Sequence, residues 1–364
     1  MNEARSRLLP AAAWIFLAFA FTYFLSALLR AVTATLAPVF SSELGLGAAD
    51  LGLLAGAYFI GFAALQLPLG RSLDRFGPRR TLLVLLTLAV LGCGAFAMAG
   101  SLGMLASTLP VQWLLPTLGW RGLFWLVAAL LALGMVVLAW LVPRDAPAPT
   151  VQAGGGYATI ARHPTFVAMA PLGFWLYGGM IAVQALWAGP WLTRVAGQTP
   201  GQAAEGLFVI NLAMLLTFAA WGGLMPRLVR RGWTAVRIMA WGIPLALGLL
   251  VLNVVLGPGA GALHWAAWCV ACTAVSVSQP AVGAAFPAAQ AGRALSAFNL
   301  VIFSGVFTVQ WGVGLVVDLL RGLGWQEVQA FQGAMGALGV CCALSYAWFH
   351  WRLRVALPAA ATVR

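Results

Sequence analysis

Arg30 is the one charged residue well inside a long apolar segment of this 364-residue sequence, 22 residues after Leu8. Burying an arginine at the centre of a bilayer costs about 2.5–3.5 kcal/mol on insertion scales, so such residues usually have a function. The separation corresponds to about 33 Å of helix, which places Arg30 towards the outer leaflet. Two interpretations stay open: Arg30 contacts a substrate or gate, or its guanidinium reaches the membrane interface.

Uncharged polar side chains are the other groups in the apolar segments that could do chemistry. A buried amide needs a hydrogen-bond partner and so usually faces the interior of a helix bundle, where it binds a neighbouring helix or a substrate. The candidates are Gln112, Gln184, Asn211, Gln279, Asn299 and Gln310. No nucleophile elbow, HExxH zinc motif, phosphate-binding loop or dinucleotide fingerprint accompanies them. The sequence therefore predicts no enzyme, no cofactor and no metal site.

The composition indicates that the solvent of this chain is a lipid bilayer. Apolar residues make up 62% of it, charged residues only 8%, and the mean hydropathy is +0.95. Soluble domains carry about 25% charged residues, so a soluble enzyme and a disordered chain are both excluded. The net charge of +12 comes from 20 arginines without a lysine. We interpret this excess as a topology signal rather than as a nucleic-acid surface.

Long apolar stretches predict an all-α protein that crosses the membrane many times. A helix needs about 20 residues to cross, and every backbone N–H in lipid must be paired within the segment. The glycine-rich sequence at 257–261 divides the stretch 238–292 in two. The predicted spans are 8–29, 51–70, 81–100, 122–143, 164–193, 206–226, 238–256, 262–287, 294–317 and 328–349.

The uncharged stretch 81–120 is too long for one span, and the arginine positions decide its path. One net crossing places 16 arginines inside and three outside, whereas two crossings give 9 and 10. Arginines gather in cytoplasmic loops, so one crossing is favoured, with both termini cytoplasmic and the chain in the cell inner membrane. Residues 101–119 are then expected to form a partial or re-entrant segment. Four residues would break a helix there: Gly103, Pro110, Pro116 and Gly119.

An internal repeat relates the two halves of the sequence. A shift of 152 residues aligns Gly70 with Gly222, Arg75 with Arg227, and Arg79 with Arg231. Downstream the halves differ, because Gly222 to Trp351 spans 129 residues and Gly70 to Val142 only 72, a difference of 57. Counting thus gives a two-fold repeated helical membrane protein with six spans in one half and an incomplete set in the other.

The loop after the second span carries a basic motif, Gly70-x-x-x-Asp74-Arg75-x-Gly77-x-Arg79-Arg80. It resembles the cytoplasmic signature of the major facilitator superfamily, which lies between the second and third spans. The stretch Gln184-Ala-Leu-Trp187-Ala-Gly-Pro-Trp191 is similar to seventh-span sequences of proteobacterial members. The resemblance covers nearly the whole chain. It implies two helical bundles around a central cavity, joined by a long cytoplasmic loop.

On this resemblance, residues 1–143 are an N-terminal bundle, 144–163 a cytoplasmic linker and 164–364 a C-terminal six-helix bundle. The family's fourth span opens with an Arg-x-x-x-Gly motif, but 81–120 contains no charged residue. The fourth span and the start of the fifth are therefore expected to be missing. Because the fourth helix lines the cavity in the family, the ability to transport is left open.

The resemblance also implies roles for individual residues. The seventh and eleventh helices of the family face the cavity, which singles out Gln184 and Asn299. The substrate-binding candidates are Arg30, Gln184, Trp187, Asn299 and Gln310. The gating candidates are Gly70, Asp74, Arg75, Gly77, Arg79 and Arg80, which resemble a latch that favours one side-open state. The alternative is a plain basic loop that sets topology. An arginine in the first span of several anion-carrying members resembles Arg30 and indicates an anion.

The leading hypothesis is a monomeric secondary transporter of a small solute, with an anion favoured, that works by alternating access. A proton is the candidate coupling ion, although Asp318 and Glu205 at predicted span ends are the few carboxylates available. The alternative hypothesis is a remnant of such a transporter, still inserted in the bilayer but unable to transport.

Overall fold

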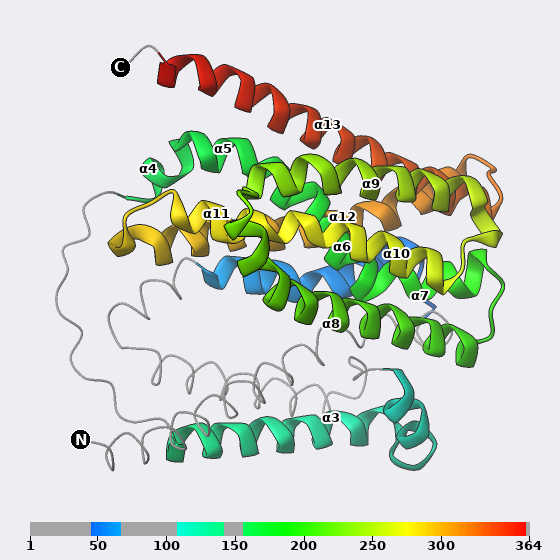
Figure 1. Cartoon of the computed structure of the whole chain (residues 1–364). Helices are drawn as coiled ribbons and strands as arrows, with labels where there is room; N and C mark the ends of the chain where they lie inside the picture. Colours follow the sequence, from blue (N-terminus) through cyan, green and yellow to red (C-terminus); the bar gives the residue numbers. More distant parts are fainter. Residues whose placement is uncertain (1–44, 67–107, 142–155, 362–364) are drawn as a thin grey trace. The chain divides into compact units, whose positions relative to one another are not determined.

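The computed structural model describes residues 45–66, 108–141 and 156–361 (Figure 1). Every regular element within these ranges is a helix, which confirms the all-α polytopic prediction. Seven of these helices are long and apolar enough to cross a bilayer: Ala48–Gln66, Pro164–Val195, Pro200–Trp221, Ala235–Gly259, Ala262–Ala284, Gln290–Gly322 and Glu327–Val355.

The helices divide between two compact units, each described by itself. One contains α3 (Thr108–Leu141); the other, called the main unit, contains Ala48–Gln66 and the helices of residues 156–361. The α-helices of the main unit after Gln66 are α4 (Tyr157–Arg162), α5 (Pro164–Pro171), α6 (Gly178–Ala182), α7 (Ala188–Pro190), α8 (Pro200–Arg230), α9 (Ala235–Leu256), α10 (Ala262–Cys272), α11 (Ser278–Ala284), α12 (Ala288–Gly322) and α13 (Glu327–Ala361). Segments with π geometry are η1 (Leu172–Tyr177), η2 (Val183–Trp187) and η3 (Trp191–Val195); 3₁₀ segments are η4 (Gly257–Gly259) and η5 (Thr273–Val277).

Helix α3 corrects one prediction. It is a single helix of 34 residues that runs through Pro110, Pro116 and Gly119 and continues past Arg121. The predicted re-entrant break within 108–119 and the start of a separate span at 122 are therefore wrong. Pro110 lies in the first turn, where its missing N–H has no helical partner to lose, and an apolar helix tolerates an interior proline better than a soluble one. Residues 81–107 lie outside the described ranges.

The predicted break near residue 257 is confirmed. Helix α9 ends at Leu256, and α10 begins at Ala262. Gly257 has a φ of 52°, in the left-handed region that residues with a side chain rarely adopt. The chain therefore turns back here and the long apolar stretch becomes two spans. Helix α8 begins where Thr199 and Gln202 form a reciprocal capping box.

The span Pro164–Val195, which corresponds to the seventh helix of the family and is here called the seventh span, is irregular along its whole length. Between Pro164 and Val195, short α-helical pieces alternate with the three π segments. Each π turn places an extra residue in the turn, and such turns occur frequently at functional sites. Pro171 explains the first of them, because it cannot donate the N–H that an α-helix requires at that position.

Helix α12 lies between the seventh span and the helix Ala48–Gln66, and glycines let the backbones approach. A Cβ on Gly305 would overlap the backbone of Phe174, and a Cβ on Gly52 would overlap the carbonyl group of Gln310. Small residues at such crossings are the usual means of close packing in membranes. These contacts fix α12 at the centre of the main unit.

Charged residues of the main unit separate to its two ends. Consecutive spans run in opposite directions, so that Arg194 meets Glu327 at one end, and the Trp348 indole meets the Val167 carbonyl at the other. The acidic end holds Asp50, Glu205, Asp318, Glu327, Arg194 and Arg321. The arginine end holds Arg162, Arg227, Arg230, Arg231, Arg237, Arg293, Arg352 and Arg354, with no acidic residue among those described.

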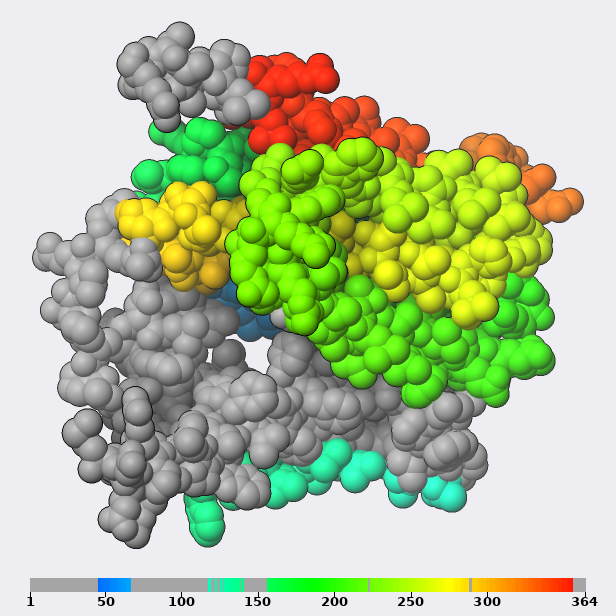
Figure 2. Space-filling view, viewed as in Figure 1, coloured from blue at the N-terminus to red at the C-terminus, as the bar shows by residue number. Residues whose placement is uncertain are grey.

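The outer surface of the main unit is apolar between these ends. Figure 2 presents the face formed by α8, α9 and α10. Large apolar side chains are exposed on these helices, among them Leu215, Trp241, Leu245, Val255 and Leu263. A surface of this kind is expected of spans that contact lipid.

Candidate functional site

Three polar side chains from three different spans form one connected group, here called the Tyr–amide cluster. Gln279 in α11 donates from Nε2 to Oδ1 of Asn299 in α12, over 2.6 Å. Tyr177, the last residue of η1, donates from its hydroxyl to Oε1 of Gln279, over 3.5 Å. Each of the three side chains is only partly buried. The cluster joins the spans Pro164–Val195, Ala262–Ala284 and Gln290–Gly322.

Local sequence features place the members of the cluster. Tyr177 ends the π segment, and Gly178, which follows it, packs against the backbone at Gly305 of α12. The 3₁₀ segment η5 ends at Val277, just before Gln279. Irregular turns in two of the three spans therefore flank the residues that bind one another. A glycine crossing holds the third span close enough for these bonds.

The cluster keeps hydrogen-bonding capacity for a ligand. Nδ2 of Asn299 has two N–H groups and forms no hydrogen bond with any described residue. Nε2 of Gln279 has a second N–H beyond the one that Asn299 accepts. Amide N–H groups donate to carbonyl, hydroxyl and carboxylate oxygens. These amide N–H groups can therefore donate to an oxygen-bearing solute.

Gln184 forms a second contact between spans. Its Nε2 donates to Oδ1 of Asn211 in α8 over 2.9 Å, and Nδ2 of Asn211 donates to the carbonyl oxygen of Leu207. Gln184 and Asn299, which the sequence singled out together, thus bond to different partners. Each forms the hydrogen bond between helices that the sequence left open as an alternative to a substrate contact.

Trp187 and Gln310 meet at a fully buried contact. The Trp187 indole Nε1 donates to the backbone carbonyl oxygen of Gln310 over 3.1 Å, and both residues are 0% exposed. The Gln310 side-chain amide has no partner at either polar atom among the described residues. Leaving such a group buried and unpaired costs about 1–3 kcal/mol. Of the predicted binding residues that are described, Gln310 therefore has the most to gain from a new partner.

Asp318 joins α12 to the helix Ala48–Gln66 at the acidic end. Its carboxylate accepts the N–H of Ala49 at 2.7 Å and that of Ala48 at 3.3 Å. It thereby satisfies two backbone donors at a helix start and lies at the positive end of the helix dipole. The sequence offered Asp318 as a carboxylate for proton coupling. In the structure it caps a helix from another span.

Several predicted residues lie outside the described ranges, namely Arg30, Gly70, Asp74, Arg75, Gly77, Arg79 and Arg80. Their roles stay predictions. Sequence reasoning did not select Tyr177, although a tyrosine inside an apolar span was a usable signal. It also gave no role to Asn253, which is fully buried with both amide atoms unpartnered in the described structure. No group of three or more His, Cys, Asp or Glu residues within the described ranges could hold a metal ion.

Comparisons with known proteins agree on one family. The sequence model of the Major Facilitator Superfamily matches residues 19–109. Two structures of a bacterial homolog of the human lysosomal transporter Spinster have the same fold. Both are inward-facing; the unoccupied one gives a TM-score of 0.64 at 18% identity and the occupied one 0.65 at 16%. Each match covers 95% of this chain and 97% of the other.

The chain is thus similar to the major facilitator superfamily in sequence over residues 19–109, and its fold is similar to that of the two Spinster-homolog structures. It is also 31% identical to human monocarboxylate transporter 11 over 278 residues, which cover 74% of this chain and 51% of that protein. The chain thus spans about half the length of this curated relative. The family resemblance predicted from the loop motif is confirmed.

Proposed function

We propose that this chain is a secondary transporter that moves a small solute across the membrane by alternating access. The observation that carries the proposal is the Tyr–amide cluster, in which partly exposed polar side chains from three apolar spans meet and keep N–H groups for a ligand. An amide in an apolar span is costly unless its N–H groups are paired, so the unused N–H groups of this cluster call for a ligand. In this proposal the solute is that ligand.

A small carboxylate is the solute class that we propose. The amide N–H groups of Gln279 and Asn299 suit carboxylate oxygens, and Arg30 would add a charge if it contacts the solute. The similarity to a protein named monocarboxylate transporter 11 supports the same class. In this proposal Gln184, Trp187 and Gln310 contribute to the same pathway, with Gln310 gaining a partner when the solute or water reaches it.

The separation of charges supports an orientation. The arginine end carries eight arginines and no described acidic residue, and basic residues gather on the cytoplasmic side of membrane proteins. We therefore place the arginine end in the cytoplasm of a cell with this protein in its inner membrane, with both termini on that side. The Asp318 contact then lies on the outer side, where it would hold the transporter closed while the cytoplasmic side is open.

Uptake into proteoliposomes tests the proposal. We expect the purified chain to take up a radiolabelled monocarboxylate such as lactate, and Asn299→Leu to raise KM at least tenfold, because the ligand loses a charge-assisted hydrogen bond. Gln326→Leu, in the exposed turn before α13, is the matched control and should transport normally. If Asn299 only joins two helices, its loss should lower the melting temperature and leave KM unchanged. That result would overturn its role as a ligand contact.

A second candidate function has one observation in its favour. The first half of the chain is 57 residues shorter than the second, downstream of the aligned motif. A bundle without its fourth span and part of its fifth would lack one wall of the cavity. A remnant of this kind would insert and melt cooperatively but take up none of a panel of organic anions, cations and neutral solutes, and none of them would shift its melting temperature.

A further inference from the structure

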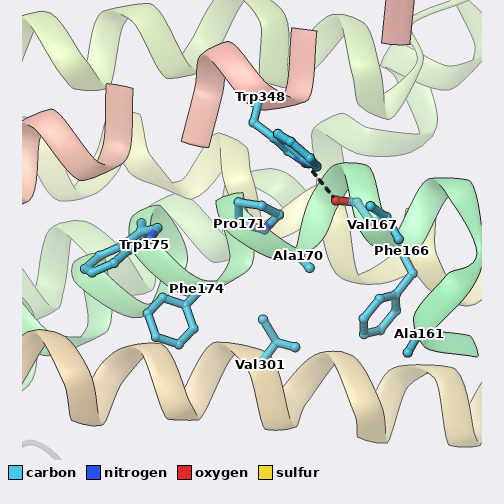
Figure 3. Close-up of a pocket in the computed structure, with 9 residues that line it drawn as sticks. All are labelled: Ala161, Phe166, Val167, Ala170, Pro171, Phe174, Trp175, Val301 and Trp348. Atoms are coloured by element: carbon cyan, nitrogen blue, oxygen red, sulfur yellow. Dashed lines mark hydrogen bonds between the residues drawn. The ribbon is translucent and has the colours of Figure 1, made fainter. Parts of the chain in front are cut away.

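An apolar groove opens on the main unit near its arginine end. Its volume is about 410 Å³, within the range of about 300–1,000 Å³ that small-molecule sites occupy. The groove lies between the first half of the seventh span, α12 and α13 (Figure 3). Its wall is formed by apolar and aromatic side chains, chiefly Phe166, Pro171, Phe174, Trp175, Val301 and Trp348.

One hydrogen bond joins two lining residues of the groove, and its origin is visible in the sequence. Pro171 has no N–H, so it cannot donate to the carbonyl of Val167 four residues earlier as an α-helix requires. The Trp348 indole Nε1 donates to that carbonyl instead, over 3.0 Å (Figure 3). This bond joins α13 to the seventh span, and Val167, Pro171 and Trp348 all line the groove.

Two arginines follow lining residues of this groove closely in the sequence. Arg162 is exposed and follows directly after Ala161, which lines the groove. Arg352 lies one turn after Trp348, with its guanidinium carbon 5.8 Å from the centre of that ring and 6.0 Å from the centre of the Trp351 ring. Neither arginine forms an ion pair with a described residue. Both guanidinium groups can therefore bind an external anion.

The groove and its rim together resemble the two halves of a phospholipid. An apolar cleft suits an acyl chain, and a guanidinium group suits a phosphate, which accepts its N–H groups in a fork geometry. Basic pockets between spans are known to bind acidic lipid headgroups. A zwitterionic lipid carries its own cation beside the phosphate and gains less from this rim. Charge complementarity therefore selects an anionic lipid as the occupant.

We propose that this groove is a binding site for an anionic phospholipid, with one acyl chain between the seventh span, α12 and α13 and the phosphate held by Arg162 and Arg352. The site is separate from the Tyr–amide cluster and does not depend on whether the chain transports a solute. Pro171 and Trp348 shape the cleft, and the two arginines select the headgroup.

Native mass spectrometry of the full chain in detergent tests the site, with dioleoylphosphatidylglycerol and dioleoylphosphatidylcholine as probes. We expect phosphatidylglycerol to bind more tightly, and the double variant Arg162→Gln/Arg352→Gln to lose about 5- to 30-fold in affinity for it. Affinity for phosphatidylcholine should change little. The matched control is Arg230→Gln/Arg231→Gln, which removes the same charge from the same end on α8.

The second arm fills the groove. Ala170→Phe places a ring among the lining residues and should reduce binding of both lipids, whereas Ala219→Phe, on the exposed face of α8, should not. If Ala170→Phe does not purify as a single species, Ala161→Phe at the exposed rim replaces it.

Three outcomes would overturn the proposal. The first is unchanged phosphatidylglycerol affinity in the Arg162→Gln/Arg352→Gln variant. The second is an equal loss in the Arg230→Gln/Arg231→Gln control, since the effect would then belong to the whole basic end. The third is a dimer that Ala170→Phe dissociates, because the groove would then hold a second copy of the chain.

Discussion

The two ends of the main unit handle charge in opposite ways. At the acidic end, Asp318 caps the helix Ala48–Gln66 and Glu327 lies 3.5 Å from Arg194, so carboxylates serve contacts within the protein. At the arginine end, no acidic residue stands among those that the structure describes. The described carboxylates of the main unit thus lie at one end, and eight of its described arginines lie at the other. Substitutions that weaken each end separately can test this difference.

The largest effect is expected at the glycine crossing beside the acidic end. Gly52→Ala adds a Cβ that would overlap the carbonyl of Gln310, so we expect about 1–3 kcal/mol of destabilisation and a wider separation of the two helices. Thermal unfolding measures the loss of stability. Double electron–electron resonance between labels at residues 46 and 323, in a variant without native cysteines, measures the separation of the two helices.

Gly61→Ala is the control for that substitution, because it lies on the same helix with nothing within 4 Å of its Cβ position. There alanine should stabilise the helix by about 0.5–1 kcal/mol relative to glycine. The two substitutions are thus expected to have opposite signs. A stabilising Gly52→Ala would mean that the crossing is not close-packed.

Loss of the Asp318 cap should have the next largest effect. Asp318→Asn keeps an acceptor oxygen but removes the charge, so we expect a loss of about 0.5–2 kcal/mol and more open conformers at this end. Asp50→Asn serves as the comparison, since Asp50 accepts only the N–H of Gly47 three residues away. The same spin-label distances should widen for Asp318→Asn alone. Equal distributions in the two variants would contradict a cap that holds two spans together.

At the arginine end, Trp348→Phe should cost about 1 kcal/mol. The substitution removes the N–H that satisfies the Val167 carbonyl, while most of the apolar contact stays. Trp351→Phe is the control, as Trp351 is exposed and close in sequence. The melting temperatures of the two variants should differ. If they coincide, the indole bond contributes nothing measurable.

The smallest effect is expected for Glu327→Gln. Its carboxylate lies 3.5 Å from Arg194 and 3.6 Å from Arg321, but all three side chains are partly or largely exposed. Exposed pairs contribute about 0–1 kcal/mol, and salt screens them further. The difference in melting temperature from the unmodified chain should therefore shrink between low and high salt. A large effect that persists at high salt would show that this pair is more than a surface contact.

The sequence predicted the spans well because apolar length and the glycine break at 257 are local properties of the chain. For the amides it left open a bond to a neighbouring helix or a contact with a substrate, since an amide in lipid has few other options. It could not predict which partners meet: Gln279 with Asn299 depends on how three spans cross, and those crossings depend on glycine contacts such as Gly305 with Phe174. The path of α3 was wrong because rules for proline derived from water overstate its effect in an apolar helix.

The separation of charge between the two ends has a consequence in an energised membrane. A voltage acts on each charge moved across it with about 2.3 kcal/mol per elementary charge per 100 mV. With the arginine end in the cytoplasm, the negative interior attracts the eight arginines of that end. An inverted molecule would have to carry them against the field. In that orientation the membrane potential would therefore oppose inversion of this protein, in addition to the cost of moving arginines through lipid.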